Sequence, residues 1–314
     1  MPITTEFEYA RPTTLDEALR IMSLYKETAR ILAGGTDLIV HLKENLARPA
    51  VVVDIKAIEG LDKIEVKDGP RTLKSTQLKT DFKVRGGVLS LGALVTFADI
   101  IDSDAVRKHC PLLWEASRTV ASTGVRNRAT VAGNICSAVP SADSAPALAV
   151  YDAEIIVKSL KGVRNIPIHG WFAGPKKTVL APEEIVLAIE LNLPRVKTGG
   201  CYAKLSRYEG EDLAQGGIAA LALAGETYRV AACALGPKPA RCPKTEAVLN
   251  GNKLGEKVLA RAKEALLKEI SPITDIRSTK EYRLHMAAVM LERALRAAAA
   301  RLSGKGPRYG EPVI

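Results

Sequence analysis

The stretch Thr130–Cys136, with the sequence TVAGNIC, decides how this chain is interpreted, and Pro140–Ser144, with the sequence PSADS, follows it closely. Both segments consist of small residues around one glycine, Gly133, and one acidic residue, Asp143. Because glycine has no Cβ atom, it lets a main chain approach a ligand closely. The composition therefore predicts a backbone that lies directly against a phosphate-bearing cofactor.

The composition places the chain among globular proteins. Its 314 residues are enough for about two or three domains. Hydrophobic residues make up 47% and charged residues 25%, which is ordinary for a globular protein. The N-terminus lacks a basic region followed by an apolar core, and no apolar run reaches membrane-spanning length. We therefore expect a cytoplasmic protein without membrane insertion.

The net charge of +10 raises the question of a nucleic-acid partner. The basic residues are spread along the chain and only 4% of residues are aromatic, so a base-stacking surface is poorly supported. An acidic partner protein or an anionic cofactor explains the charge equally well. We predict no nucleic-acid binding.

The cysteines and histidines predict neither a metal site nor a catalytic triad. The five cysteines are scattered, without a CxxC pair, and the four histidines form no recognisable metal-ligand or triad spacing. Such a pattern is typical of reduced, mostly buried thiols in a cytosolic protein. No residue is predicted to act as a catalytic acid, base or nucleophile.

The first part of the chain is predicted to be a compact α/β unit. Its expected elements are a helix over 15–25 with Thr14 as N-cap, strands over 29–33 and 50–55, and a helix over 38–46. Between the first strand and the second helix lies the Gly-Gly turn 34–37, which puts backbone N–H groups at a helix N-terminus suited to phosphate. A Gly-Gly turn alone is structural in most proteins.

The middle of the chain alternates helices and strands. We expect helices over 97–101, 104–109 and 112–120, a polar loop over 121–129, an apolar run over 147–151 and strands over 154–158, 164–168 and 184–193. The basic segment Lys67–Arg85 interrupts a hairpin. Its composition favours a solvated, extended hairpin, and a docking surface is the alternative.

The last part is predicted to form a separate domain. Residues 194–200 are interpreted as a linker, followed by strands over 201–205, 217–223 and 228–235 and by helices between 253 and 302. In the last helix, a core stripe is expected at Met286, Val289, Met290, Leu295 and Ala299. His285 is expected on the surface or as a cap.

Taken together, Ala33–Leu38 (AGGTDL), Thr130–Cys136 and residues 140–148 resemble the paired signatures of one flavoprotein family. This family is the FAD-binding medium subunit of the molybdenum hydroxylases, which include carbon monoxide, xanthine and nicotinate dehydrogenases and 4-hydroxybenzoyl-CoA reductase. The resemblance covers nearly the whole chain. Two such glycine signatures roughly a hundred residues apart, in this order, are specific, whereas either alone is weak.

The resemblance implies an α+β fold. A two-subdomain FAD-binding fold of the PCMH type is expected at 1–58 and 59–195. A C-terminal α+β domain with a small antiparallel sheet and helices is expected at 196–314. FAD is expected to lie extended between the two subdomains.

The resemblance also implies which residues bind the cofactor. Its pyrophosphate is expected on backbone amides of both glycine segments, where convergent N–H donors and small side chains suit a dianion. These residues are Ala33, Gly34, Gly35, Thr36, Asp37, Leu38, Thr130, Val131, Ala132, Gly133 and Asn134. Asp143 is expected to accept a hydrogen bond from a ribose hydroxyl, and a loop-capping aspartate is the alternative.

Further cofactor contacts are implied more weakly. Val120, Thr123, Val186 and Lys204 match positions that line the nucleotide or the isoalloxazine edge in relatives. The turn over 208–213 is expected to approach the flavin ring, with Leu213 or Tyr208 covering one face.

Two features depart from the family pattern. Ala132 replaces a glycine found in most relatives, so the geometry of this turn is in question. The basic segment Lys67–Arg85 is longer than the family's usual hairpin. The 4-hydroxybenzoyl-CoA reductases carry an extra iron–sulfur cluster in a cysteine-bearing insertion, but this sequence contains no cluster of cysteines. We therefore predict no iron–sulfur cluster in this chain, which makes that substrate less favoured.

The implied function is electron transfer within a complex. A large molybdopterin-binding subunit and a small [2Fe–2S] subunit are expected as partners, in a dimer of heterotrimers. FAD in this chain would pass electrons to NAD, a quinone or another acceptor. The alternatives are a free-standing FAD-dependent oxidase or reductase and a non-catalytic basic scaffold that has lost flavin.

Overall fold

The computed structural model describes residues 2–67, 85–208 and 212–314. Its N-terminal part is a three-stranded parallel sheet in the order β1-β3-β2. Its elements are β1 (Glu8–Ala10), α1 (Leu15–Tyr25), η1 (Lys26–Thr28), β2 (Ala29–Leu32), α2 (Leu38–Lys43), β3 (Val51–Asp54) and η2 (Ile55–Ala57). Helix α1 begins where predicted because the Thr14 side chain accepts a hydrogen bond from the Glu17 amide, 3.3 Å away.

The second part contains a five-stranded antiparallel sheet in the order β4-β5-β10-β6-β7. Its strands are β4 (Ile64–Lys67), β5 (Arg85–Gly92), β6 (Glu154–Ser159), β7 (Gly162–Pro167) and β10 (Ile185–Pro194). A two-stranded hairpin accompanies it, formed by β8 (Phe172–Gly174) and β9 (Lys177–Thr178). The interior of the basic segment, residues 68–84, lies outside the described residues.

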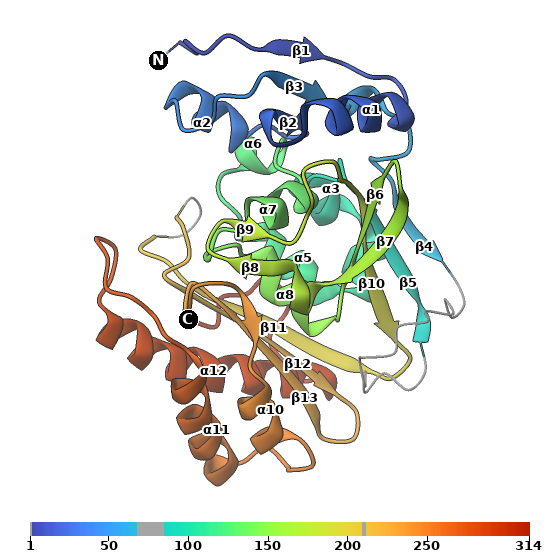
Figure 1. The fold of residues 1–314 in the computed structure, drawn as a ribbon. Coiled ribbons are helices and arrows are strands. Elements are labelled where there is room, and N and C mark those ends of the chain that lie inside the picture. The colour runs from blue at the N-terminus through green and yellow to red at the C-terminus, as the bar shows by residue number, and fades with distance from the viewer. Residues whose placement is uncertain (1, 68–84, 209–211) are drawn as a thin grey trace.

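Short helices fill the space beside this sheet (Figure 1). They are α3 (Phe97–Asp102), α4 (Asp104–His109), α5 (Pro111–Arg118), α6 (Thr123–Arg126), α7 (Val131–Ser137), α8 (Ser144–Val150) and α9 (Ile168–Trp171). The prediction of a polar loop over 121–129 is wrong in part, because this segment contains α6. Ser122 starts that helix by accepting a hydrogen bond from the Val125 amide, 3.3 Å away.

The C-terminal part is a four-stranded antiparallel sheet in the order β11-β12-β13-β14, covered by three helices. Its elements are β11 (Thr198–Leu205), β12 (Gly216–Leu223), β13 (Thr227–Cys233), β14 (Ala240–Arg241), α10 (Pro243–Leu249), α11 (Glu256–Glu269) and α12 (Lys280–Leu302). The strands match the prediction, whereas α10 precedes the region in which helices were expected. The confirmed fold class is therefore α+β.

The interpretation of residues 194–200 as a linker is wrong in part, because only residues 195–197 connect the two strands. β10 runs to Pro194 and β11 starts at Thr198, so the two glycines of the supposed linker lie inside a buried strand. Gly199 is required by close packing, since a Cβ atom there would lie 2.2 Å from the Ala298 carbonyl oxygen of α12. The glycines that suggested a linker instead allow a close helix–strand contact.

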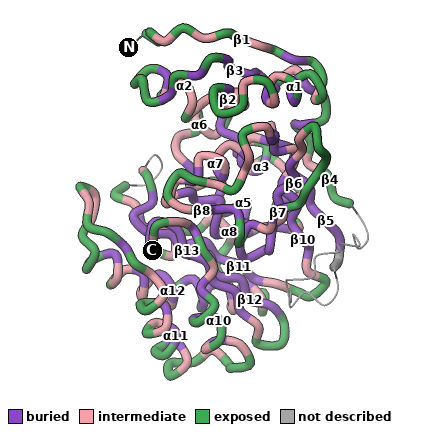
Figure 2. Tube along the Cα trace, in the orientation of Figure 1, coloured by how far each residue is buried: buried purple, intermediate pink, exposed green. Residues whose placement is uncertain are grey.

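The buried core joins the parts of the molecule (Figure 2). One hydrophobic cluster runs from β5 through α5, α7 and α8 to Tyr202, Leu221 and Cys233 of the C-terminal sheet. The other face of that sheet packs against α10, α11 and α12. Helices α5 and α8 therefore lie between the five-stranded and the four-stranded sheets.

Helix α12 buries a different stripe from the predicted one. Met290 and Leu295 are buried as expected, but Met286, Val289 and Ala299 are only half-buried. The helix buries its small face, with Ala287, Ala294 and Ala298, because glycines of β11 and β12 bring the sheet close. His285 is exposed, as predicted.

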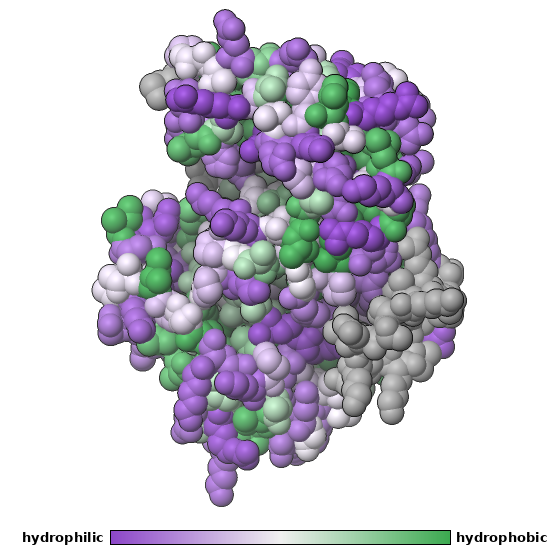
Figure 3. Space-filling model, viewed as in Figure 1, coloured by the Kyte–Doolittle hydropathy of each residue, from purple (hydrophilic) through white to green (hydrophobic). Residues whose placement is uncertain are grey.

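The surface is largely polar. Hydrophilic side chains dominate the face shown in Figure 3, and hydrophobic ones form separate small groups. In the described parts of the chain, no helix is both long and apolar enough to cross a membrane.

Candidate functional site

The two glycine segments meet in space although they lie far apart in the sequence. Gly34 packs against the main chain that precedes α7, where a Cβ atom would lie 2.0 Å from the Arg128 carbonyl oxygen. Gly35 adopts a φ of +79°, a left-handed conformation that favours glycine. The pair GG is therefore needed for two different reasons, close approach at the first position and backbone conformation at the second.

A side-chain contact joins the same segments at a second point. The Ser137 hydroxyl, at the end of α7, donates a hydrogen bond to the Asp37 carboxylate at the start of α2. Asn134 connects α7 to α8, because its side-chain oxygen accepts a hydrogen bond from the Ser144 hydroxyl of α8, 2.7 Å away. α2, α7 and α8 are thus held as one group.

The stretch Thr130–Cys136 is mainly a helix. Thr130 is the N-cap of α7, and its hydroxyl accepts a hydrogen bond from the Gly133 amide at 2.9 Å. Ala132 lies in the first turn and does not have a positive φ. An alanine fits this helical position without strain, which resolves the departure from the family's glycine.

A large cavity opens beside the joined segments, with a volume of about 880 Å³. The predicted site residues that line it come from the first two parts of the chain, up to β10, and from the C-terminal part. They are Ala33, Gly34, Gly35, Thr36, Asp37, Leu38, Val120, Thr130, Ala132, Gly133, Asn134, Asp143, Val186 and Leu213.

The other four predicted residues do not line this cavity. Val131 points into the hydrophobic core at 1% exposure. Thr123 starts α6, where its hydroxyl accepts a hydrogen bond from Arg126 at 2.9 Å. Tyr208 is 62% exposed, and Lys204 is buried behind Asp143. Their predicted cofactor contacts stay predictions.

Asp143 is a buried carboxylate held from the C-terminal sheet. Its two oxygens accept hydrogen bonds from the Tyr202 hydroxyl at 2.7 Å and from the Lys204 ammonium at 3.0 Å. Burial raises the pKa of Asp143, and the Lys204 charge and the Tyr202 hydrogen bond oppose that rise. Although Asp143 occupies the N-cap position of α8, its side chain makes no cap hydrogen bond, so the alternative of a loop-capping aspartate is wrong.

Sequence reasoning missed several other lining residues. The lining also includes residues of η1 and β2, among them Arg30, and of the β8–β9 hairpin, among them Lys176. Apolar walls come from Phe97, Leu180 and Ile185. No local motif marks these positions, because the chain brings them to the cavity only through the pairing of distant strands.

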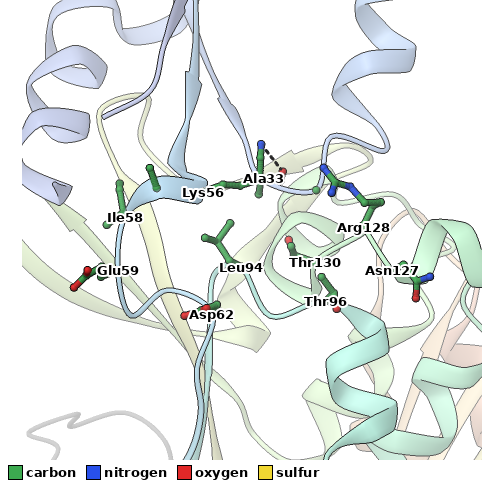
Figure 4. A pocket seen from close by; sticks show the side chains of 12 residues that line it. Ala33, Lys56, Ile58, Glu59, Asp62, Leu94, Thr96, Asn127, Arg128 and Thr130 are labelled. Atoms are coloured by element: carbon green, nitrogen blue, oxygen red, sulfur yellow. Dashed lines mark hydrogen bonds between the residues drawn. The ribbon is translucent and has the colours of Figure 1, made fainter. Parts of the chain in front are cut away.

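A smaller cleft of about 310 Å³ shares Ala33, Gly34 and Thr130 with the large cavity (Figure 4). Lys56 lies on one side of it and donates a hydrogen bond to the Ala33 carbonyl at 3.4 Å. Arg128 lies on the other side. Because the lining also carries the carboxylates of Glu59 and Asp62, this cleft has no net preference for an anion.

The thiols and acidic groups suit neither metal binding nor nucleophilic chemistry. Within residues 2–67, 85–208 and 212–314, no three His, Cys, Asp or Glu side chains are grouped as a metal site requires. Cys136, which lines the large cavity, is a free thiol whose pKa burial raises to about 12. It is therefore a protonated thiol at neutral pH.

Comparison with known families matches the two parts of the chain to two domain types. Residues 5–194 match the family described as the FAD binding domain in molybdopterin dehydrogenase. Residues 201–298 match the CO dehydrogenase flavoprotein C-terminal domain.

Individual relatives are similar over almost their full length. The chain is 30% identical over 302 residues to a xanthine dehydrogenase FAD-binding subunit of Escherichia coli O157:H7, which covers 95% of this chain and 97% of the relative. It is 29% identical over 303 residues to the carbon monoxide dehydrogenase medium chain of Hydrogenophaga pseudoflava, covering 95% of this chain and 99% of that relative. A solved structure of carbon monoxide dehydrogenase from that organism superimposes with a TM-score of 0.86 at 30% identity, covering 96% of this chain and 99% of that one.

Proposed function

This chain belongs to the family of FAD-binding medium subunits of molybdenum hydroxylases, and we propose that it takes electrons from a partner's [2Fe–2S] clusters and delivers them from FAD to an external acceptor. It is a flavoprotein subunit of an oxidoreductase, with FAD as its cofactor. The observation that carries the proposal is the junction of Ala33–Leu38 with the start of α7 at the wall of the large cavity.

The cavity fits a dinucleotide in size and chemistry. Its volume of about 880 Å³ lies near the upper end of the range of about 300–1,000 Å³ for small-molecule and cofactor sites. Small residues and two helix starts form the wall expected to face phosphate, and both supply backbone N–H groups without side-chain bulk. Apolar side chains such as Val186 and Leu213 form walls suited to flat rings.

The residues of the site bind and orient the cofactor and take no part in proton transfer. Main-chain amides of Ala33–Leu38 are proposed to hold the pyrophosphate together with the segment Thr130–Asn134, in which the Val131, Gly133 and Asn134 amides already donate hydrogen bonds within the chain. Asp143 is proposed to accept a hydrogen bond from a ribose hydroxyl. Val120, Val186 and Leu213 exclude water from the rings. Bound FAD supplies the redox chemistry, because an isoalloxazine exchanges electrons with both one-electron and two-electron partners.

The wider assembly is also part of the proposal. The partners are a molybdopterin-binding large subunit and a [2Fe–2S] small subunit in a cytoplasmic dimer of heterotrimers, and the acceptor is NAD or a quinone. The similarity to medium chains of this family supports this arrangement. We propose that the chain divides into subdomains 1–58 and 59–195 and a C-terminal domain 196–314.

The test is reconstitution of the full chain. The purified protein is expected to be yellow, and the apoprotein to recover a bound-flavin absorption spectrum with FAD. Rapid mixing with a reduced [2Fe–2S] protein is then expected to bleach the flavin band. A chain that stays colourless after reconstitution contradicts the proposal, and turnover of a small substrate by the isolated chain favours a free-standing oxidase or reductase instead.

A further inference from the structure

Both oxygens of the Asp143 carboxylate are bound by side chains of one strand, β11. The Tyr202 hydroxyl donates to Oδ1 at 2.7 Å, and the Lys204 ammonium donates to Oδ2 at 3.0 Å. These side chains lie two residues apart and therefore on the same face of the strand. The carboxylate that lines the cavity is thus held by the C-terminal sheet.

The two donors are themselves fixed. Tyr202 is 5% exposed, and its backbone amide donates to the Glu115 carboxylate of α5 at 2.7 Å. The Lys204 side chain is 7% exposed, and its ammonium also donates to the Thr119 carbonyl oxygen at 2.7 Å. Burial and these further hydrogen bonds hold both donors in place, so the pair favours the Asp143 rotamer that meets them.

The far end of α8 is attached to the same sheet. Asp152, just after this helix, accepts hydrogen bonds from Arg229 of β13 at 2.6 Å and from Arg241 of β14 at 2.8 Å. With Asp143 held at the start of α8 and Asp152 beyond its end, ionic contacts fasten both ends of the helix to the C-terminal sheet. The direction of α8 is therefore set by that sheet.

We propose that Tyr202 is a positioning residue for the flavin site, acting with Lys204 to hold Asp143 as a charged acceptor turned toward the ribose of FAD. The proposal rests on the proposed function, in which Asp143 binds that ribose. An ionised carboxylate offers about four lone-pair directions, and the two donors leave others available for a ligand hydroxyl. The C-terminal sheet thus completes a nucleotide site whose phosphate-binding segments lie elsewhere.

The hydroxyl of Tyr202 also affects the charge of Asp143. The titratable groups around this carboxylate are Lys204 and Tyr202 of β11 and Cys233 of β13, whose Sγ atom lies 3.4 Å from the Tyr202 hydroxyl. A hydrogen bond donated to the charged form favours that form. Without the hydroxyl, we expect Asp143 to protonate at a higher pH.

The experiment compares Tyr202→Phe with the wild-type full chain. The dissociation constant for FAD is measured by flavin fluorescence between about pH 5 and 8, a range in which a raised carboxyl pKa becomes visible. We expect the Tyr202→Phe constant to be about tenfold higher at pH 7, equivalent to about 1.4 kcal/mol. As the pH is lowered, the affinity of Tyr202→Phe for FAD is expected to fall at a higher pH than that of the wild type.

Two further variants make the result specific. Tyr228→Phe removes a hydroxyl from β13 of the same sheet, where the residue is 7% exposed and packs in the cluster on the other face. This control is expected to bind FAD like the wild type at every pH. Asp143→Asn is expected to weaken binding and to remove the acid-side loss of affinity, because no carboxyl is left to titrate.

The outcomes separate this inference from the proposed function. If the wild type and Asp143→Asn behave as expected but Tyr202→Phe keeps the wild-type constant and pH profile, the positioning role is wrong and the function stands. An equal weakening at all pH values indicates only a packing role and also overturns the inference. If Asp143→Asn binds FAD normally, Asp143 does not hold the ribose and the inference fails, although FAD binding remains.

Discussion

Replacing Gly34 by alanine tests whether the contact between the two glycine segments sets FAD affinity. The added Cβ atom would lie 2.0 Å from the Arg128 carbonyl oxygen and 3.1 Å from the Ala129 Cα. Close carbon–oxygen contacts in proteins are about 3.3–3.6 Å, so the facing main chain must retreat by roughly 1.3 Å. Since Gly34 does not have a positive φ, the effect is steric and not conformational.

The size of the effect follows from the cost of overpacking. Inserting a methyl group into a closely packed contact costs about 1–3 kcal/mol. If FAD binding requires the native separation, that cost appears in the dissociation constant as an increase of about five- to 150-fold. The fold is expected to persist, because Gly34 lines the cavity and, of the residues facing it across this contact, only Ala129 belongs to a core cluster.

The assay is a fluorescence titration of apoprotein with FAD, accompanied by urea unfolding of the apoprotein. Gly170→Ala is the matched control, because a Cβ atom at that exposed position meets nothing within 4 Å. We expect Gly170→Ala to bind like the wild type. If Gly34→Ala binds FAD within about twofold of the wild type, the junction does not set the pyrophosphate site and the steric reasoning is refuted.

Three further predictions concern stability. Arg301→Met leaves the buried Glu115 carboxylate without the guanidinium that it contacts at 2.8 Å. We expect the free energy of unfolding in urea to fall by about 3 kcal/mol, the lower end for a broken buried pair, because Glu115 still accepts from two backbone amides. Gly199→Ala is expected to lower the free energy of unfolding by about 1–3 kcal/mol through its clash with α12. The dissociation constant of the folded protein for FAD is expected to stay unchanged. For Asp152, burial acts to raise the pKa, but the His169 hydrogen bond and the Arg229 and Arg241 charges outweigh burial and lower it. Its stabilising contribution is therefore present above the unfolded pKa of about 3.9 and is lost as the pH falls through the lower folded value. The deficit of Asp152→Asn in urea midpoint is expected to be largest near pH 7 and to shrink below about pH 4, and a constant deficit would contradict this origin.

Local sequence patterns predicted much of the fold because they act over a few residues. The Thr14 cap and the spacing of Ala18, Leu19 and Met22 define α1 without reference to any other element. The same local logic placed the strands of the C-terminal sheet. It failed at residues 198–200, where Gly199 allows a close contact with α12 that no neighbouring residue indicates.

The candidate site shows the same division. Motif reasoning predicted Ala33–Leu38 and Thr130–Asn134, most of which line the cavity, because phosphate binding by main-chain amides favours small residues. It did not find Tyr202, whose hydroxyl reaches Asp143 across 59 positions of the chain. A single buried tyrosine in a strand resembles any core tyrosine until its partner is known.

By itself, the sequence indicated the family and its α+β fold through the resemblance of its two glycine segments to known signatures, and it predicted many helices and strands, since helix capping and periodicity are properties of short stretches. Only the tertiary structure decided that Gly34 touches the main chain before α7, that Thr130–Cys136 is chiefly a capped helix, and that Asp143 is held by the C-terminal sheet. These facts depend on contacts between residues far apart in the chain, and their geometry is fixed by packing of the whole core.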